Sequence, residues 1–234
     1  MPATIQITLD LTGHPQIYPA RLHGAACALL ETPDSDHQRQ YKPFAVGPLY
    51  DIDGSTRWRL GWLAEQPPPQ LPDRIRLGDV DCDVRAAHFD NTSYARLADS
   101  KPARHAQLQV VSPMYFSRNG RDHPLPDPVL IVRNLAQRWN AHAPALFAIT
   151  DELLRAITGT VFLHAMAGET VRTPVSATMH QTGFFGTVRL GLIKAADHTT
   201  RTIFAALMQF AIIAGIGAQT THGFGAIRVK DLAP

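Results

Sequence analysis

The order of two apolar spacings along this chain restricts its fold more than any other sequence feature. Apolar residues occupy alternate positions from Ile5 to Leu11, which predicts a half-buried strand. Residues 18–31 then place apolar side chains at helical spacing behind Pro19, a residue that the first turn of a helix tolerates. A strand followed by a helix at the start of a 234-residue chain favours a mixed fold with one large or two small domains.

The remaining segments continue this order in two rounds. Strands are predicted at 44–50, 56–63, 75–86, 106–111, 160–178, 185–193 and 224–229, and helices from the Pro-rich loop 123–128 to Trp139, at 151–157 and at 199–214. The pattern predicts an α+β fold of tandem ferredoxin-like (RRM-like) domains, in which helices cover one face of each antiparallel sheet. The second helix of the first unit is missing or reduced. The boundary is expected near residue 103, between an N-terminal domain at 1–103 and a C-terminal domain at 104–234.

The charge of the chain is small overall but unevenly distributed. With 45% hydrophobic and 18% charged residues and a formal net charge of +2, the composition excludes a disordered chain. Residues 118–234 carry 11 basic against 7 acidic residues, and arginine outnumbers lysine by 18 to 4. Because a planar guanidinium suits phosphate better than an ammonium does, this bias is compatible with an anionic partner such as nucleic acid. A solvated basic face would explain it equally well.

The N-terminal residues, the apolar stretches and the cysteines predict a cytoplasmic protein. The first ten residues show no basic region followed by an apolar run, and the longest apolar stretch, 203–217, is too short to span a bilayer. Cys27 and Cys82 are far apart and form no CxxC pair, so we expect neither a disulfide framework nor a cysteine-based zinc site. No membrane contact and no cofactor are expected.

A glycine-rich segment follows the predicted helix 199–214. It reads GIGAQTTHGFG from Gly215 to Gly225 and leads directly into the last predicted strand. One glycine at the end of the helix and one in a turn would satisfy such a connection, yet the segment has four. Extra glycines allow a backbone to lie close to a ligand, and their amides can face phosphate oxygens. Nucleotide-binding glycine loops precede a helix, whereas this one follows it.

With these residues in view, the chain resembles a known family. GIGAQTTHGFG is similar to the glycine-rich loop of the RAMP (repeat-associated mysterious protein) superfamily of CRISPR systems. LHGAACALLE, KPFAVGPLY, VVSPMYF, LPDPVLIVRNLAQRWN and GFFGTVRLGL resemble segments of its repeat-RNA processing endoribonucleases, in the expected order between residues 21 and 229. The resemblance implies tandem ferredoxin-like domains, binding of CRISPR repeat RNA, and cleavage without a metal that leaves 5′-OH and 2′,3′-cyclic phosphate ends. Subunits of a CRISPR effector complex are a further implied partner.

The resemblance also implies which residues bind and cut the RNA. The family's catalytic histidine matches His37, and its lysine at the start of the following strand matches Lys42. Where some members carry a tyrosine on the first helix, this chain has Cys27, so Tyr41 or His23 could serve as the base, or positioning of the RNA could replace one. His222 is a further candidate. The residues implied to contact RNA are Gly215, Gly217, Thr220, Thr221, His222, Gly223, Gly225 and Arg228.

The residue types alone support this chemistry without a metal. An imidazole can take or give a proton near neutral pH, and a lysine or arginine can stabilise the charge that develops on phosphorus. Asp79, Asp81 and Asp83 alternate but lack the glycine and glutamate of a calcium loop, so we interpret them as solvent-facing residues at a strand edge. The other histidines show no metal-ligand spacing, and no metal site is predicted.

Two further functions remain compatible with the sequence. A non-catalytic RNA-binding subunit of a CRISPR effector complex would have the same fold and glycine loop. A ferredoxin-like protein that binds a small molecule would fit the fold but would leave the arginine bias and the glycine loop unexplained. Cleavage of repeat RNA distinguishes the first alternative, and RNA binding the second.

Overall fold

The computed structural model describes residues 1–11, 17–31 and 41–234, and its strands form two main antiparallel sheets. The first sheet has the order β2-β3-β1-β5-β4 and the second β11-β6-β10-β9. The first sheet comprises β1 (Ala3–Asp10), β2 (Phe44–Ile52), β3 (Ser55–Trp62), β4 (Arg74–Leu77) and β5 (Val80–Asn91). The second comprises β6 (His105–Met114), β9 (Val161–Pro174), β10 (His180–Leu192) and β11 (Ile227–Ala233). The α+β prediction is confirmed.

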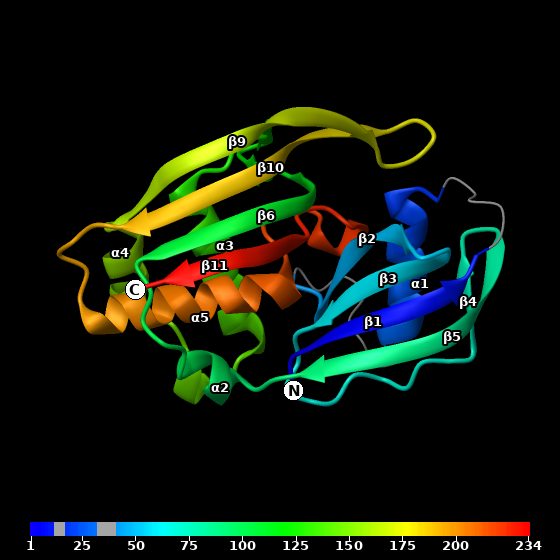
Figure 1. The fold of residues 1–234 in the computed structure, drawn as a ribbon, viewed down its shortest axis with the longest axis horizontal. Coiled ribbons are helices and arrows are strands. Elements are labelled where there is room, and N and C mark those ends of the chain that lie inside the picture. Colours follow the sequence, from blue (N-terminus) through cyan, green and yellow to red (C-terminus); the bar gives the residue numbers. More distant parts are fainter. Residues whose placement is uncertain (12–16, 32–40) are drawn as a thin grey trace.

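Helices pack on one face of each sheet, as Figure 1 shows, with α1 behind the first sheet. The helices are α1 (Pro19–Leu30), α2 (Tyr94–Ala98), α3 (Pro128–His142), α4 (Asp151–Thr158) and α5 (His198–Ala214). Two short 3₁₀ turns, η1 (Ala145–Phe147) and η2 (Thr220–His222), and a small hairpin of β7 (Phe116–Arg118) and β8 (Arg121–His123) complete the described part of the chain. None of the described helices has both the length and the apolar content of a membrane span.

The first core forms between α1 and the inner face of the first sheet. Along β1, Ile5, Ile7 and Leu9 are buried while the residues between them are partly exposed, which confirms the predicted alternation. Helix α1 contributes Leu22 and Leu30 to the same core. Pro19 occupies its first turn, and the helix ends at Leu30 because Glu31 turns to an extended backbone conformation.

The second core forms between α3, α5 and the inner face of the second sheet. Two aspartates begin these helices: the Asp127 carboxylate accepts the backbone N–H of Leu130, and Asp197 accepts that of Thr200 at 2.7 Å. The largest fully buried side chains here include Trp139 of α3. These caps explain why the two helices start where the sequence places them.

Two predicted strands differ from the structure, since the one predicted at 224–229 is β11 (Ile227–Ala233) and the one predicted at 75–86 is divided in two. The strand predicted at 75–86 is a hairpin, because Gly78 takes a φ of +68° and turns the chain between β4 and β5. Asp79 therefore lies at the turn, while Asp81 and Asp83 are exposed on β5, which is not an edge strand. All three side chains are exposed, which confirms that they face solvent, but their assignment to a strand edge is wrong.

The reduced second helix of the first unit is the five-residue α2, whose Tyr94 packs edge-on against Trp139 at 4.8 Å between ring centroids.

Direct contacts join the first sheet to the second sheet and to α5. On β3, the Arg59 guanidinium donates to the carbonyl of Ile227 at 2.9 Å, and α5 lies against the backbone of Gly61. A Cβ at Gly61 would lie 1.8 Å from the Ile213 carbonyl oxygen, so only glycine allows α5 to approach β3 so closely.

Candidate functional site: the glycine loop and the polar face of α1

The glycine-rich segment after α5 folds tightly against the rest of the chain. Gly215, Gly217, Gly223 and Gly225 all have φ between +65° and +94° and are buried. A Cβ at Gly217 would lie 2.3 Å from the Tyr115 carbonyl oxygen, and one at Gly225 would lie 1.8 Å from that of Ile216. The extra glycines were expected to let the loop lie close to a ligand. At Gly217 and Gly225, the missing side chain instead lets the loop lie close to the protein's own backbone.

The middle of the loop is the part that faces another functional candidate. Here η2 contacts both α1 and β2. The imidazole ring of His222, in η2, stacks on that of His23, in α1, with 3.8 Å between the ring centroids and 12° between the ring planes. His23 Nδ1 lies 2.9 Å from the carbonyl oxygen of Thr221, and the Thr221 hydroxyl lies 3.2 Å from His222 Nδ1. The structure thus brings together both alternative histidines of the sequence analysis.

This environment makes His222 difficult to protonate. Burial, with a smaller contribution from the nearby His23, lowers the pKa of His222 from its ordinary 6.5 to about 4. At neutral pH, His222 is therefore a neutral imidazole. A neutral, half-buried ring that is stacked on one side is suited to holding the loop in place rather than to attracting phosphate by charge.

Polar side chains continue from this stack along one face of α1. His23, Cys27 and Glu31 follow one another at intervals of four residues, so they share a face of the helix. Cys27 Sγ lies 3.6 Å from His23 Nε2. Burial raises the pKa of the Cys27 thiol, and the nearby Glu31 carboxylate raises it further. The residue that stands where some family members have a tyrosine is thus a protonated thiol at neutral pH.

The predicted catalytic lysine lies at the far end of this polar face. Lys42, just before β2, forms an ion pair with Glu31, in which Nζ contacts Oε1. Tyr41, half-buried beside it, is close enough to the guanidinium of Arg138 to affect its pKa. His37 lies outside the described residues. Of the predicted catalytic residues, the structure therefore places Lys42 beside the end of α1 and Tyr41 near Arg138.

A buried arginine that the sequence analysis missed anchors this region. Arg138 of α3 donates to the carbonyl of Ala214, at the C-terminus of α5, and lies 3.4 Å from the carbonyls of Gly215 and Phe44. Burial lowers its pKa to about 10, which still leaves it charged at neutral pH. It connects the start of the glycine loop to the start of β2. Arg138 lies at helical spacing from Ile131 and Leu135, on the apolar face of the helix, and this position could have predicted that it is buried.

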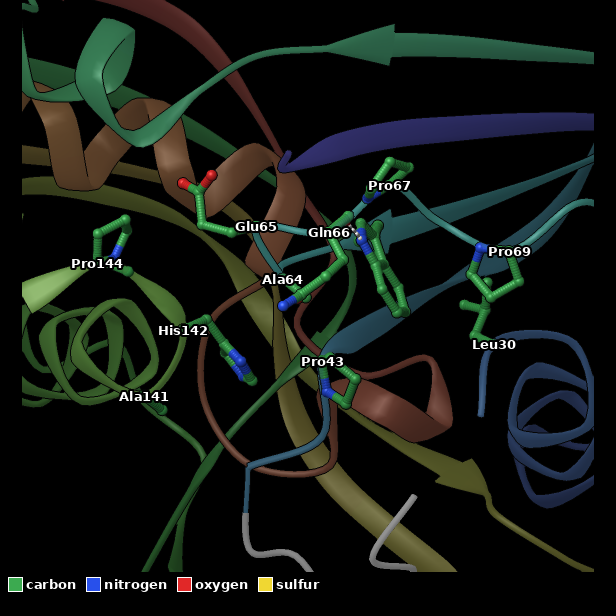
Figure 2. A pocket seen from close by; sticks show the side chains of 12 residues that line it. Leu30, Pro43, Ala64, Glu65, Gln66, Pro67, Pro69, Ala141, His142 and Pro144 are labelled. Carbon is green, nitrogen blue, oxygen red and sulfur yellow. Dashed lines mark hydrogen bonds between the residues drawn. The ribbon is translucent and has the colours of Figure 1, made fainter. Parts of the chain in front are cut away.

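Two cavities contain residues that the sequence analysis or the site description names. One of about 670 Å³, shown in Figure 2, lies between the segment after β3 and the end of α3, with Leu30, Pro43 and His142 in its wall. The other, of about 480 Å³, opens between the two sheets and is lined by Tyr50, Arg59 and Arg228 among others. Arg228, predicted to contact RNA, is exposed and lies over the Tyr50 ring at 6.0 Å. Within the described ranges, no three metal-ligating side chains gather as a metal site would require.

Comparison with known proteins decides the family. Residues 108–227, slightly more than half of the chain, match the family model of the CRISPR-associated endoribonuclease Cas6. The chain belongs to the Cas6 family. The family identified by resemblance in the sequence is thereby confirmed, and so is its class of activity, RNA cleavage within CRISPR RNA processing.

Individual Cas6 proteins resemble this chain over most of their length. A Cas6 endoribonuclease of Mycobacterium tuberculosis is 25% identical over 238 residues, which cover 91% of this chain and 72% of that protein. Among solved structures, the product complex of the Cas6 protein TTHA0078 has a TM-score of 0.83 at 25% identity and covers 98% of this chain and 99% of its own. The product complex of the Cas6 protein TTHB231, from Thermus thermophilus, has a TM-score of 0.82, also at 25% identity, and covers 98% and 100%.

Proposed function

We propose that this chain binds CRISPR repeat RNA and cleaves it through attack by the RNA's own 2′-hydroxyl, without a metal ion. In this reaction the 2′-oxygen bonds to phosphorus while the bond from phosphorus to the 5′-oxygen breaks. One group removes the 2′-OH proton and another protonates the leaving 5′-oxygen. The products have a 2′,3′-cyclic phosphate and a 5′-OH, so neither water nor a redox partner is consumed.

The observation that carries this proposal is the junction of the glycine loop with the strand that begins after Lys42. Turn η2 contacts β2 and α1 directly. The Arg138 side chain connects the start of the glycine loop, at Gly215, to the start of β2, at Phe44. An RNA held at Thr221 and His222 would reach Lys42 by following the polar face of α1 from His23 to Glu31, which is about 12 Å along the helix. The product complexes of the Cas6 proteins TTHA0078 and TTHB231, which share this fold at 25% identity, support RNA as the ligand.

The proposed roles follow the chemistry of each side chain. His37 transfers a proton, because an imidazole titrates near neutral pH. Lys42 supplies positive charge to the phosphorane, and Tyr41 is the second proton-transfer candidate. In the proposed RNA-binding loop, the partly exposed Thr221 and His222 contact the RNA, and Arg228 is a phosphate contact outside the loop. The loop residues Gly215, Gly217, Thr220, Gly223 and Gly225 are buried and give the loop its shape. The division at residue 103, a cytoplasmic location and effector-complex partners stay predictions.

The nucleophile can be tested directly. A single 2′-deoxy substitution on the nucleotide upstream of the cut should abolish cleavage while leaving binding nearly intact, and cleavage of the unmodified RNA should continue in excess EDTA. His37→Ala should slow single-turnover cleavage by roughly 10²–10⁴. His88→Ala, at an exposed position on β5, serves as the control and should cleave at the normal rate.

Three results would contradict the proposal. Cleavage of the deoxy substrate at the normal rate would make water the nucleophile, and inhibition by EDTA would show that a metal takes part. A wild-type protein that binds repeat RNA but never cuts it would favour the non-catalytic RNA-binding subunit instead.

A further inference from the structure

The ion pair between Glu31 and Lys42 is unlike the other ion pairs of the described chain. The Glu31 side chain is 4% exposed and that of Lys42 is 14% exposed. By contrast, Arg21 of α1 pairs with Asp79 at 3.4 Å, and these two side chains are 55% and 81% exposed. A buried charge is tolerated only when it is paired and hydrogen-bonded, so the Glu31–Lys42 pair is held where an exposed pair would open and close in solvent.

The carboxylate of this pair is fixed from the helix side. Glu31 ends α1, and its backbone N–H donates to the Cys27 carbonyl at 2.9 Å. Its side chain is hydrogen-bonded to the Cys27 thiol, which in turn lies 3.6 Å from His23 Nε2. His23 is held by the stack on His222 and the contact with the Thr221 carbonyl. A continuous row of polar contacts therefore extends from the glycine loop to the Lys42 ammonium.

We propose that Glu31 is a positioning residue, whose carboxylate holds the Lys42 ammonium in the place from which it stabilises the phosphorane. This inference rests on the proposed function, in which Lys42 supplies that charge. A lysine side chain has four rotatable carbon bonds and loses considerable entropy when it is held in one conformation. Pairing with a carboxylate on the end of a rigid helix orders it before the RNA arrives. An ammonium has three N–H donors, so it can hold a carboxylate and a phosphate oxygen at once.

The test is a double-mutant cycle on cleavage rate. The variants are Glu31→Gln, Lys42→Met and the double variant, assayed under single turnover with saturating protein, alongside the dissociation constant for the uncleavable 2′-deoxy RNA. Glu31→Gln should lower the cleavage rate by up to about 100-fold, the scale of a misplaced catalytic group, and change RNA affinity by less than about threefold. In the Lys42→Met background the same substitution should change the rate less than about twofold, because no ammonium is left to position.

Controls separate positioning from a loss of folding. Urea unfolding of each variant shows whether it is folded at the assay temperature, and Glu31→Asp replaces Glu31→Gln if the latter unfolds. Asp79→Asn removes a carboxylate that forms an exposed ion pair with Arg21 of α1, and this variant should cleave at the wild-type rate. Recovery of part of the lost rate by Glu31→Asp is also expected, because a carboxylate is restored.

Several results would overturn the inference. One is an equal loss of cleavage rate from Glu31→Gln in the wild-type and Lys42→Met backgrounds. Another is a Glu31→Gln variant that cleaves at the wild-type rate. A third is a Glu31→Gln variant that cleaves faster than the wild type, which would mean that Glu31 masks the ammonium. A wild-type protein that cannot cleave the 2′-OH RNA would remove the proposed function itself, and is distinguishable because it appears before any variant is made.

Discussion

At the scale of single residues, His222 provides a prediction about pH. Its pKa is about 4 in the folded protein, lowered first by burial and then by His23, against an ordinary value of 6.5. Between these two values the unfolded chain binds a proton that the folded chain does not, so stability falls as the pH falls through this range. His222→Phe keeps a ring for the stack on His23 but removes the titration. Its free energy of unfolding should therefore fall less than that of the wild type between pH 7 and pH 5, measured by urea denaturation.

The exposed His88 gives the matched comparison, because His88→Phe removes a histidine from β5 outside the stack. Its loss of stability on acidification should parallel that of the wild type. If the His222→Phe variant also paralleled the wild type, burial and the histidine stack would not depress this pKa.

At the scale of elements, the glycine loop is predicted to contain two classes of glycine. Alanine at Gly225 or Gly217 would place a Cβ within 2.3 Å of a carbonyl oxygen in the backbone, so the loop would have to move. At Gly223 the nearest atom would be 3.9 Å away, and at Gly54 nothing lies within 4 Å. Gly223→Ala and Gly54→Ala should each cost about 1–2 kcal/mol, the strain of a left-handed backbone, and Gly225→Ala and Gly217→Ala distinctly more.

Chemical denaturation of the four alanine variants checks this order. The dissociation constant of the folded Gly223→Ala variant for repeat RNA then tests separately whether the loop contacts the RNA. Gly54→Ala, in the turn between β2 and β3, is the control for backbone strain alone. Equal costs at all four positions would show that the backbone contacts do not restrict the loop.

At the scale of the whole molecule, binding of RNA should depend strongly on salt. If about four to six basic side chains neutralise phosphates, the logarithm of affinity should fall with that of salt concentration with a slope of about −3 to −4 for single strands. Arg228→Gln removes an exposed guanidinium that lies over Tyr50 and should reduce this slope by about 0.7. Filter binding at several salt concentrations measures both values.

Arg85→Gln is the corresponding control. Arg85 is also exposed, but its guanidinium is paired at 2.6 Å with Asp10, the last residue of β1. Its substitution should leave the slope unchanged. An affinity independent of salt, or equal slopes for Arg228→Gln and the wild type, would contradict the assignment of Arg228 as a phosphate contact.

Local patterns in the sequence predicted the elements whose formation depends on near neighbours. The alternation in β1 and the proline at the start of α1 act over a few residues, so they could be read without the fold. Residue patterns also located the glycine loop and, by resemblance, the family. The length of β4 and β5 was missed because a single glycine with positive φ outweighs the strand propensity around it.

Only the tertiary structure decided how the site is assembled. His23 lies 198 residues from the carbonyl it contacts in the glycine loop, and Arg138 joins the starts of that loop and of β2 from a third segment. The Glu31–Lys42 pair is closer in sequence, yet its burial depends on what α1 and β2 pack against. Such contacts form because the chain buries its two cores and must then pair most of the polar groups left inside. That condition acts across the whole fold, so a local pattern such as an arginine on the apolar stripe of α3 can mark a buried polar residue but cannot name its partners.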